Sequence, residues 1–192
     1  YTVELWAQGA GFARFLQARL PGEAGGCLRL GPGAQRADLV VAAPDLAALP
    51  PNPAPCRALL LPGHLAPLAG GIPAAWVVSY GLTRRDTLTF SSLAQDTLCL
   101  ALQRELVTLG GVCREPQEIP LAPQGRADPL ALLAWAGTLL LLGAPPERLQ
   151  GLDIRFHART QSTADQSLLL CREQELPIYK QGIPAFFVTE YR

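Results

Sequence analysis

The chain has 192 residues, of which 49% are hydrophobic and 17% are charged, and its 16 basic residues balance 16 acidic residues. This length and composition are typical of one folded domain with a large apolar core, and they exclude a disordered protein. Zero net charge without a basic stripe argues against a protein that binds nucleic acid through its phosphates.

Short apolar segments separated by turn residues run through residues 1–80. Residues 2–7 alternate in polarity and predict a strand, and residues 12–20 carry apolar side chains at helical spacing. Further strands are predicted at residues 27–30, 38–43, 57–61 and 75–79. Strands that alternate with short crossovers predict a parallel or mixed sheet in this part of the chain.

The pattern changes after Gly81. Residues 87–91, 97–103 and 115–121 predict strands that are joined by short turns. Such consecutive strands are typical of an antiparallel meander.

A helix is predicted after the meander. Asp128 is a good N-cap, Pro129 suits the first helical position, and Gly143 provides a stop. Residues 130–142 are the most apolar stretch of the chain, but they are fewer than the ~20 residues that span a bilayer. We therefore expect a buried core helix and no contact with a membrane, followed by a short helical turn at residues 146–152.

These elements divide the chain into two parts. Residues 1–152 predict one α/β domain, with a mixed sheet that leans parallel in its N-terminal part, an antiparallel strand meander and a buried helix. Residues 153–192 differ in composition, with a polar break at residues 161–165 and a predicted strand at residues 183–189. We expect this tail to pack on the domain as an extension, to be exchanged with a neighbouring copy, which would make the protein a homo-oligomer, or to be disordered.

The cysteines indicate the compartment. They are odd in number, widely spaced and without a CxxC pair: Cys27, Cys56, Cys99, Cys113 and Cys171. Such spacing favours free thiols over a disulfide framework or a structural zinc site. We therefore expect a cytoplasmic protein that carries neither a metal nor a cofactor.

A strand–Gly-x-Gly–helix junction is the first candidate site. Gly9 and Gly11 lie where the first predicted strand meets the first predicted helix. The N–H groups of a helix N-terminus can hold a small anion. However, position 14 is Arg where a dinucleotide-binding motif has its third glycine. The alternative, a purely structural turn, is favoured.

The densest polar stretch is the second candidate site. Tyr80, Arg84 and Asp86 follow the end of a predicted buried strand. Ligands of open α/β sheets gather beyond the carboxyl ends of the strands, and arginine can bind a carboxylate or phosphate with two hydrogen bonds. The alternative is a solvated turn with ordinary ion pairs.

The third candidate site flanks a glycine turn at Gly110. Gln103 and Arg104 precede this turn, and Glu115 and Glu118 follow it. Two carboxylates and an arginine can bind a metal or share a proton. A surface ion-pair network is the favoured alternative. The three sites give nine candidate ligand-binding residues: Gly9, Gly11, Tyr80, Arg84, Asp86, Gln103, Arg104, Glu115 and Glu118.

Several standard catalytic signatures are absent from the sequence. There is no GxxxxGK[ST] phosphate loop, no GxSxG elbow and no HExxH motif around His64 or His157. The sequence therefore excludes a P-loop nucleotide hydrolase and gives no support for a serine hydrolase or a zinc protease.

From residue 75 onward, the order of features resembles the latter part of the ATP-binding central domain of Mur-type ligases. The matching pieces are the strand ending in Tyr-Gly at residues 77–82, the meander at residues 87–121 and the Leu-rich helix ending at Leu-Gly, residues 130–143. With an earlier strand at residue 38, the resemblance extends over residues 38–152. Small bacterial proteins of unassigned activity carry a similar Val-Ser-Tyr-Gly-Leu and Gln-Arg-Glu pattern.

The departures from the Mur pattern decide what this resemblance implies. The phosphate-binding Gly-Lys-Thr loop is missing, and Ala127–Asp128 stand where the family has a His-Asn pair. The resemblance therefore implies a shortened, non-catalytic relative with a binding or regulatory role. The alternatives are a small enzyme or binding protein for an anionic nucleotide or sugar phosphate, and an assembly protein that acts through a partner.

Overall fold

The computed structural model describes residues 1–20, 28–30, 36–93, 98–121 and 128–150. All described residues belong to one compact unit, Tyr1–Phe156. The predicted tail, residues 153–192, lies outside the described residues. Its strand at residues 183–189 and its exchange between copies stay predictions.

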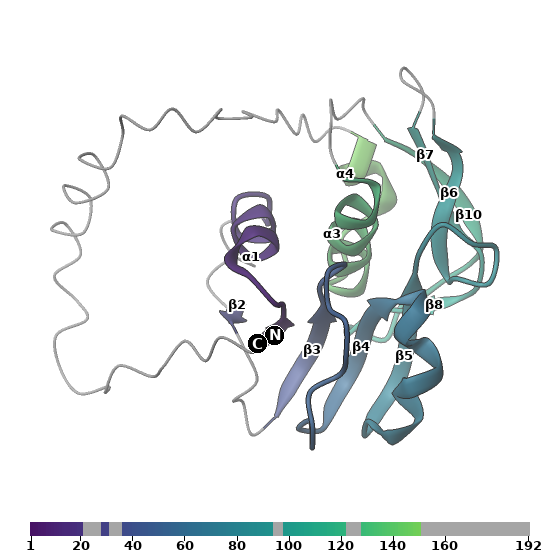
Figure 1. Cartoon of the computed structure of the whole chain (residues 1–192). Helices are drawn as coiled ribbons and strands as arrows, with labels where there is room; N and C mark the ends of the chain where they lie inside the picture. The colour runs from purple at the N-terminus through teal and green to yellow at the C-terminus, as the bar shows by residue number, and fades with distance from the viewer. Residues whose placement is uncertain (21–27, 31–35, 94–97, 122–127, 151–192) are drawn as a thin grey trace, which may run out of the picture. The chain divides into compact units, whose positions relative to one another are not determined.

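A mixed sheet forms the framework of this unit, with the strand order β10-β7-β6-β5-β4-β3-β1-β2 (Figure 1). Its strands are β1 (Val3–Trp6), β2 (Leu28–Leu30), β3 (Ala37–Ala42), β4 (Cys56–Pro62), β5 (Ala74–Tyr80), β6 (Leu88–Leu93), β7 (Leu98–Leu102) and β10 (Gln117–Leu121). Strands β1 to β5 pair in parallel, and β7 pairs antiparallel with both β6 and β10. The predicted α/β class, with a parallel first part and an antiparallel meander, is confirmed.

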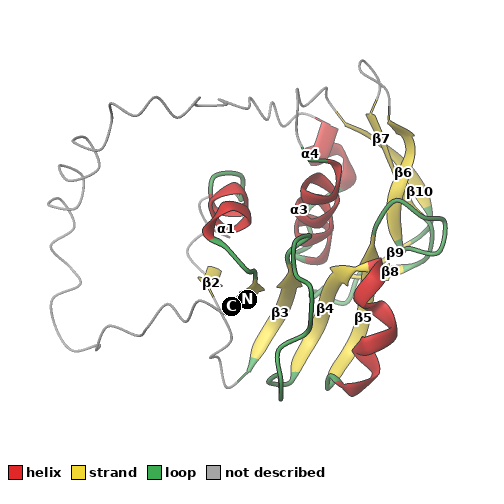
Figure 2. Ribbon diagram, in the orientation of Figure 1, coloured by secondary structure: helices red, strands yellow, loops and turns green. Residues whose placement is uncertain are grey.

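Helices cover both faces of the parallel strands (Figure 2). The α-helices are α1 (Ala10–Gln17), α3 (Pro129–Leu141) and α4 (Pro146–Gln150), and a 3₁₀-helix, η1, covers Gly63–Gly71. The side chains of Val3 and Leu5 join the core on the α1 and α3 face, whereas Trp6 joins the core on the η1 face. A strand buried on both faces needs a continuous apolar run, as in residues 58–62 of β4.

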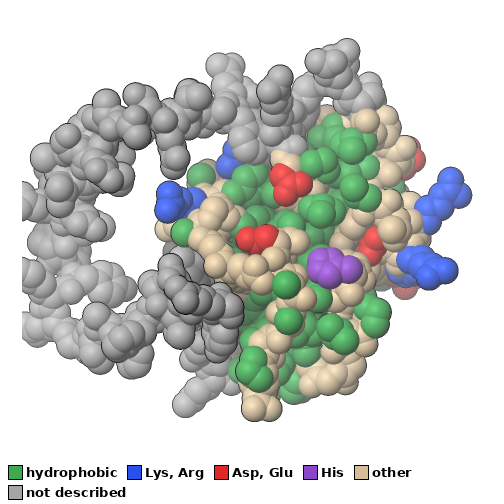
Figure 3. Space-filling model, viewed as in Figure 1, with side chains coloured by type: hydrophobic (Ala, Val, Ile, Leu, Met, Phe, Trp, Pro, Cys, Tyr) green, Lys and Arg blue, Asp and Glu red, His purple; other side chains and the backbone are tan. Residues whose placement is uncertain are grey.

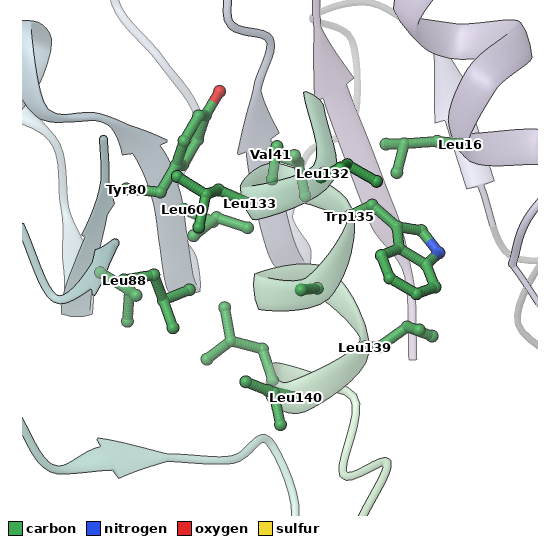
Figure 4. Packing of buried hydrophobic residues seen from close by; sticks show 14 of the residues in the cluster. Leu16, Val41, Leu60, Tyr80, Leu88, Leu132, Leu133, Trp135, Leu139 and Leu140 are labelled. Carbon is green, nitrogen blue, oxygen red and sulfur yellow. The ribbon is translucent and has the colours of Figure 1, made fainter. Parts of the chain in front are cut away.

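Helix α3 is buried along its whole apolar length. Its N-cap, Asp128, accepts a hydrogen bond from the Leu130 backbone N–H at 3.1 Å, and Gly143 follows its end with a φ of 96°. Figure 4 shows its leucines against Leu60 and Leu88 of the sheet, and Trp135 beside Leu16 of α1. The helix signals in the sequence therefore correspond to a core helix, as predicted.

Two features were not predicted. Helix η1 contains Pro67 and turns with a 3₁₀ period, so its apolar residues lack the 3.6-residue spacing that marks an α-helix. A small hairpin, β8 (Leu106–Val107) with β9 (Cys113–Arg114), surrounds the glycine turn. Its strands are too short to produce a recognisable alternation. The hairpin is anchored by Leu109, whose N–H donates to the Leu141 carbonyl at 2.8 Å.

Replacing Gly137 by Ala should destabilise the fold. A Cβ on Gly137 would lie 2.7 Å from Leu88 Cδ1 and 3.0 Å from Leu60 Cδ1, and both leucines are fully buried. We expect the free energy of unfolding to fall by about 1–2 kcal/mol, because the buried leucine methyl groups have little room to shift and this cost exceeds the ~1 kcal/mol that Ala gains over Gly inside a helix. Urea denaturation measures this change. Gly71→Ala, where a Cβ has no atom within 4 Å, is the control. Equal stability of the two variants would contradict the tight packing.

Candidate functional site

The order of the parallel strands reverses at β1. The chain passes from β1 outward to β2 and then back to β3 on the other side of β1. Helix α1, which follows β1, packs on one face of the sheet, whereas Leu46, which follows β3, packs on the opposite face. Segments that leave neighbouring strands toward opposite faces open a crevice at the carboxyl ends of those strands, where open α/β sheets bind ligands.

A pocket of about 380 Å³ lies at this reversal. Three segments line it: the start of α1, the residues after β3 and the start of α3. The lining residues are Gly11, Phe12, Phe15, Pro44, Asp45, Asp128, Leu130 and Ala131. Figure 3 shows acidic side chains set among hydrophobic ones on the face of the molecule seen in Figure 1. We call this the switch pocket.

The N-terminus of α1 forms one wall of the switch pocket. Gly9 is the N-cap and makes no side-chain capping bond, and the first turn holds no acidic residue. A Cβ at Gly9 or at Gly11 would meet no atom within 4 Å, so neither glycine is required by close packing inside the chain. The N–H groups of this helix end therefore lack the capping side chain that most helices use.

Two carboxylates carry the charge of the switch pocket among its described lining residues. Asp45 and Asp128 are both exposed, and Asp128 uses one oxygen to cap α3. The apolar wall includes Phe12 and Phe15, whose rings stack with centroids 5.9 Å apart. Carboxylates beside aromatic rings favour a ligand that has a flat apolar part and hydrogen-bond donors or a positive charge.

Tyr80 is the last residue of β5 and lies near the two aspartates. Its side chain is fully buried, and its hydroxyl donates to the Ala42 carbonyl at 2.7 Å. Burial raises the pKa of Tyr80, and the nearby charges of Asp45 and Asp128 raise it further. The hydroxyl therefore stays protonated and serves to tie the end of β5 to the end of β3.

Gln8 links two segments of this region and was missed by sequence reasoning. Its side-chain nitrogen donates to the Asp45 carbonyl at 3.3 Å, and its side-chain oxygen accepts from the Ala47 N–H at 3.2 Å. These bonds join the residues after β1 to those after β3. An isolated glutamine after a strand gives no sequence signal for such a bridge.

The polar turn at residues 81–87, which we call the arginine turn, is held by hydrogen bonds between its own residues. The Asp86 carboxylate accepts from Thr83 Oγ1 at 2.7 Å and from the Thr83 N–H at 3.2 Å. A Cβ at Gly81 would lie 2.5 Å from the same carboxylate, and a Cβ at Gly63 would also collide with it. Asp86 is only 4% exposed, so its carboxylate shapes the turn.

The exposed end of the arginine turn carries Arg84 and Arg85. Arg104, from the segment after β7, donates to the Arg85 carbonyl at 2.6 Å. Three guanidinium groups therefore belong to two segments that contact each other.

The predicted residues beside the hairpin are exposed. The pairs Leu102–Gln117 and Leu106–Arg114 bring the two flanking segments alongside each other. Within the described part of the chain, neither Glu115 nor Glu118 forms an ion pair. The described residues also contain no group of three or more His, Cys, Asp or Glu side chains that could hold a metal ion.

The nine predicted residues thus fall into three places. Gly11 lines the switch pocket, Gly9 caps its helix, and Tyr80 lies near its aspartates. The others belong to the arginine turn or to the hairpin flanks: Arg84, Asp86, Gln103, Arg104, Glu115 and Glu118. Sequence reasoning missed Phe12, Phe15, Asp45 and Asp128 as pocket residues because they come together only through the strand order.

Comparisons with protein-family models, with curated proteins and with solved structures find no match to this chain. The resemblance to Mur-type ligases therefore stays a prediction. Among the described residues, no helix combines the length and the apolar character that crossing a bilayer requires.

Replacing Tyr80 by Phe should destabilise the domain while keeping its fold. The change removes the hydrogen bond from the buried Tyr80 hydroxyl to the Ala42 carbonyl. We expect a loss of about 1–2 kcal/mol in the free energy of unfolding, measured by urea denaturation, with an unchanged circular dichroism spectrum. Tyr1→Phe, at a side chain that is 53% exposed, is the control. No difference between the two variants would show that the hydroxyl does not hold β3 and β5 together.

Proposed function

We propose that this chain is a non-catalytic binding domain whose ligand occupies the switch pocket. The position of the pocket carries the proposal: it lies beyond the carboxyl ends of β1 and β3, where the strand order reverses. Its volume of about 380 Å³ falls in the range of small-molecule sites. Hydrogen bonds from the side chains of Gln8 and Tyr80 to backbone groups of the segment at the end of β3 hold its edges in place before any ligand arrives.

The lining chemistry supports a planar ligand that carries hydroxyl or amino groups. Phe12, Phe15 and Leu130 offer apolar contact to a ring. Asp45 and Asp128 accept hydrogen bonds and attract positive charge. An anionic group beside these two carboxylates would be repelled, so the favoured ligands are nucleosides and aromatic amines.

The binding role agrees with the non-catalytic Mur-type relative that the sequence predicts. Two features resemble the ligases. Helix α3 lines the switch pocket with its first turn, and the strand that ends at Tyr80 lies near the two aspartates of the pocket. The kinship with the ligases and the regulatory role are part of the same proposal.

Matched aromatic probes test the ligand class. Tryptamine and adenosine should raise the melting temperature of the full chain, because a ligand bound only to the folded state stabilises it, by about 2.7 kcal/mol at 100 times its Kd. Indole-3-acetate has the ring of tryptamine with the opposite charge and should have little effect. Asp45→Asn should weaken tryptamine binding about tenfold and reduce the difference between the two indoles. Calorimetry measures both affinities.

Glu118→Gln removes an exposed carboxylate outside the switch pocket and is the control for Asp45→Asn. Equal shifts with tryptamine and indole-3-acetate would contradict the role of the aspartates, and no shift with any probe would contradict the pocket as a site for this ligand class. Release of phosphate from ATP by the purified chain would contradict the non-catalytic role.

A second candidate function is the binding of a small anion at the arginine turn. Its support is the contact between Arg104 and the Arg85 carbonyl, which holds two arginine-bearing segments together, with Arg84 exposed at the same turn. Arginine side chains bind carboxylate and phosphate groups through paired hydrogen bonds. This candidate corresponds to the anionic ligand that the sequence predicts.

Replacing Arg84 by Ala tests the second candidate. If the arginine turn binds anions, inorganic phosphate at millimolar concentration should raise the melting temperature of the full chain, and Arg84→Ala should remove at least half of that rise because one guanidinium is lost. Differential scanning fluorimetry measures the rise. Arg148→Ala, at an exposed residue of α4, is the control. Equal rises in both variants would assign the effect to salt rather than to the turn.

A further inference from the structure

Strand β5 has an open edge in the middle of the sheet. On one side it pairs with β4 along its whole length, from Cys56–Ala74 to Pro62–Tyr80. On the other side, the pairing with β6 consists of Tyr80 with Leu88 alone. Strand β6 begins level with the end of β5 and runs on beyond it (Figure 1). Among the described residues, no strand pairs with this second edge over residues 74–79.

The side chains of the strand beside the open edge are mostly apolar, and two of them are exposed. Ala75 is exposed, Val77 is 42% exposed, and Trp76 is half-buried. Exposed backbone N–H and C=O groups on such an edge can pair with another strand. Natural sheets block their edges with lysine, inward charges, proline or a bulge in the strand, or with a helix or loop that covers the edge, and residues 74–80 themselves contain none of the blocking residues.

We propose that this edge pairs with the same edge of a second copy of the chain. No charged residue occurs from position 72 to position 82, so two copies meet without like-charge repulsion. A peptide recognised through acidic or basic residues would find no complementary charge within this stretch. Val77, Val78 and Trp76 are side chains that favour strand pairing. The edge is therefore complementary to itself, as a two-fold interface requires.

A two-fold axis makes the two strands antiparallel and extends the sheet across both copies. With the axis at Trp76, Ala74 lies opposite Val78 of the second copy, and Ala75 lies opposite Val77 of the second copy. Tyr80 then remains free to pair with Leu88 as it does in the single chain. The strands β6, β7 and β10 extend from the level of Tyr80 onward, away from the rest of β5, so they do not occupy the paired segment. This interface is distinct from the tail exchange that the sequence predicts.

Sedimentation of the full chain over a range of concentrations tests the proposal. We expect a concentration-dependent dimer. The double substitution Ala75→Lys and Val77→Lys should raise its dissociation constant by about tenfold or more, because like charges then face each other across the axis. Both residues are exposed, so circular dichroism should remain unchanged. The matched control is Val107→Lys with Val112→Lys, at exposed valines of the hairpin segment, and should leave the dimer intact.

Hydrogen exchange provides the second readout. In the dimer, the amides of residues 74–79 that face away from β4 should exchange at least tenfold more slowly than in the lysine variant. A chain that is monomeric at all concentrations would overturn the proposal, and so would a dimer that the lysine pair leaves unchanged. Slow exchange of these amides in a monomer would assign the edge to another segment of the same chain and would also overturn it.

Discussion

Helix α3 is buried on all sides. This burial determines where its own polar N-terminus lies and where the residues that follow β3 lie. An apolar helix of this kind has to be enclosed by other elements, here the sheet and the neighbouring helix α1 on the same face, and it can show only its termini to water. Its N-terminal Asp128 therefore lies at the rim of the core. The same rim holds the residues that follow β3, because α3 runs across β3, β4 and β5. The switch pocket thus results from how the core is packed.

Local signals in the sequence were enough to predict most elements of the sheet and the position of α3. Strands buried on both faces have continuous apolar runs, and Asp128 with Pro129 marks a helix start regardless of tertiary context. The strand order depends on contacts between distant residues and leaves no such local mark. For this reason Asp45 and Asp128 could not be recognised as neighbours across one pocket. Asp86 illustrates the converse: its residue type indicated a ligand contact, but the glycines at positions 63 and 81 make room for its carboxylate inside the turn.

Opposing electrostatic influences meet in the switch pocket. The N-terminus of α1 favours negative charge, with a strength of about 0.3–1 kcal/mol at an exposed site. Asp45 and Asp128 each carry a full negative charge, whereas the positive influences are this partial charge and the Arg19 guanidinium, whose carbon lies 4.3 Å from the Phe15 ring centroid. Tyr80 adds no charge, since burial and the two aspartates both raise its pKa. The balance favours a ligand whose donors face Asp45 and Asp128, and any anionic group of that ligand would have to lie at the helix end.

The transition from parallel to antiparallel pairing explains two further surfaces. Because β6 joins β5 at Tyr80 alone, the chain needs a turn between them, and the arginine turn is that connection. Because β6 then runs beyond β5, the earlier residues of β5 keep an unpaired edge. The arginine turn and the open edge therefore have one cause, the late start of β6. A shift of β6 toward the start of β5 would pair the open edge and would remove the room for the arginine turn. The two surfaces therefore depend on each other. The switch pocket lies at the strand reversal near β1 and depends on neither of them.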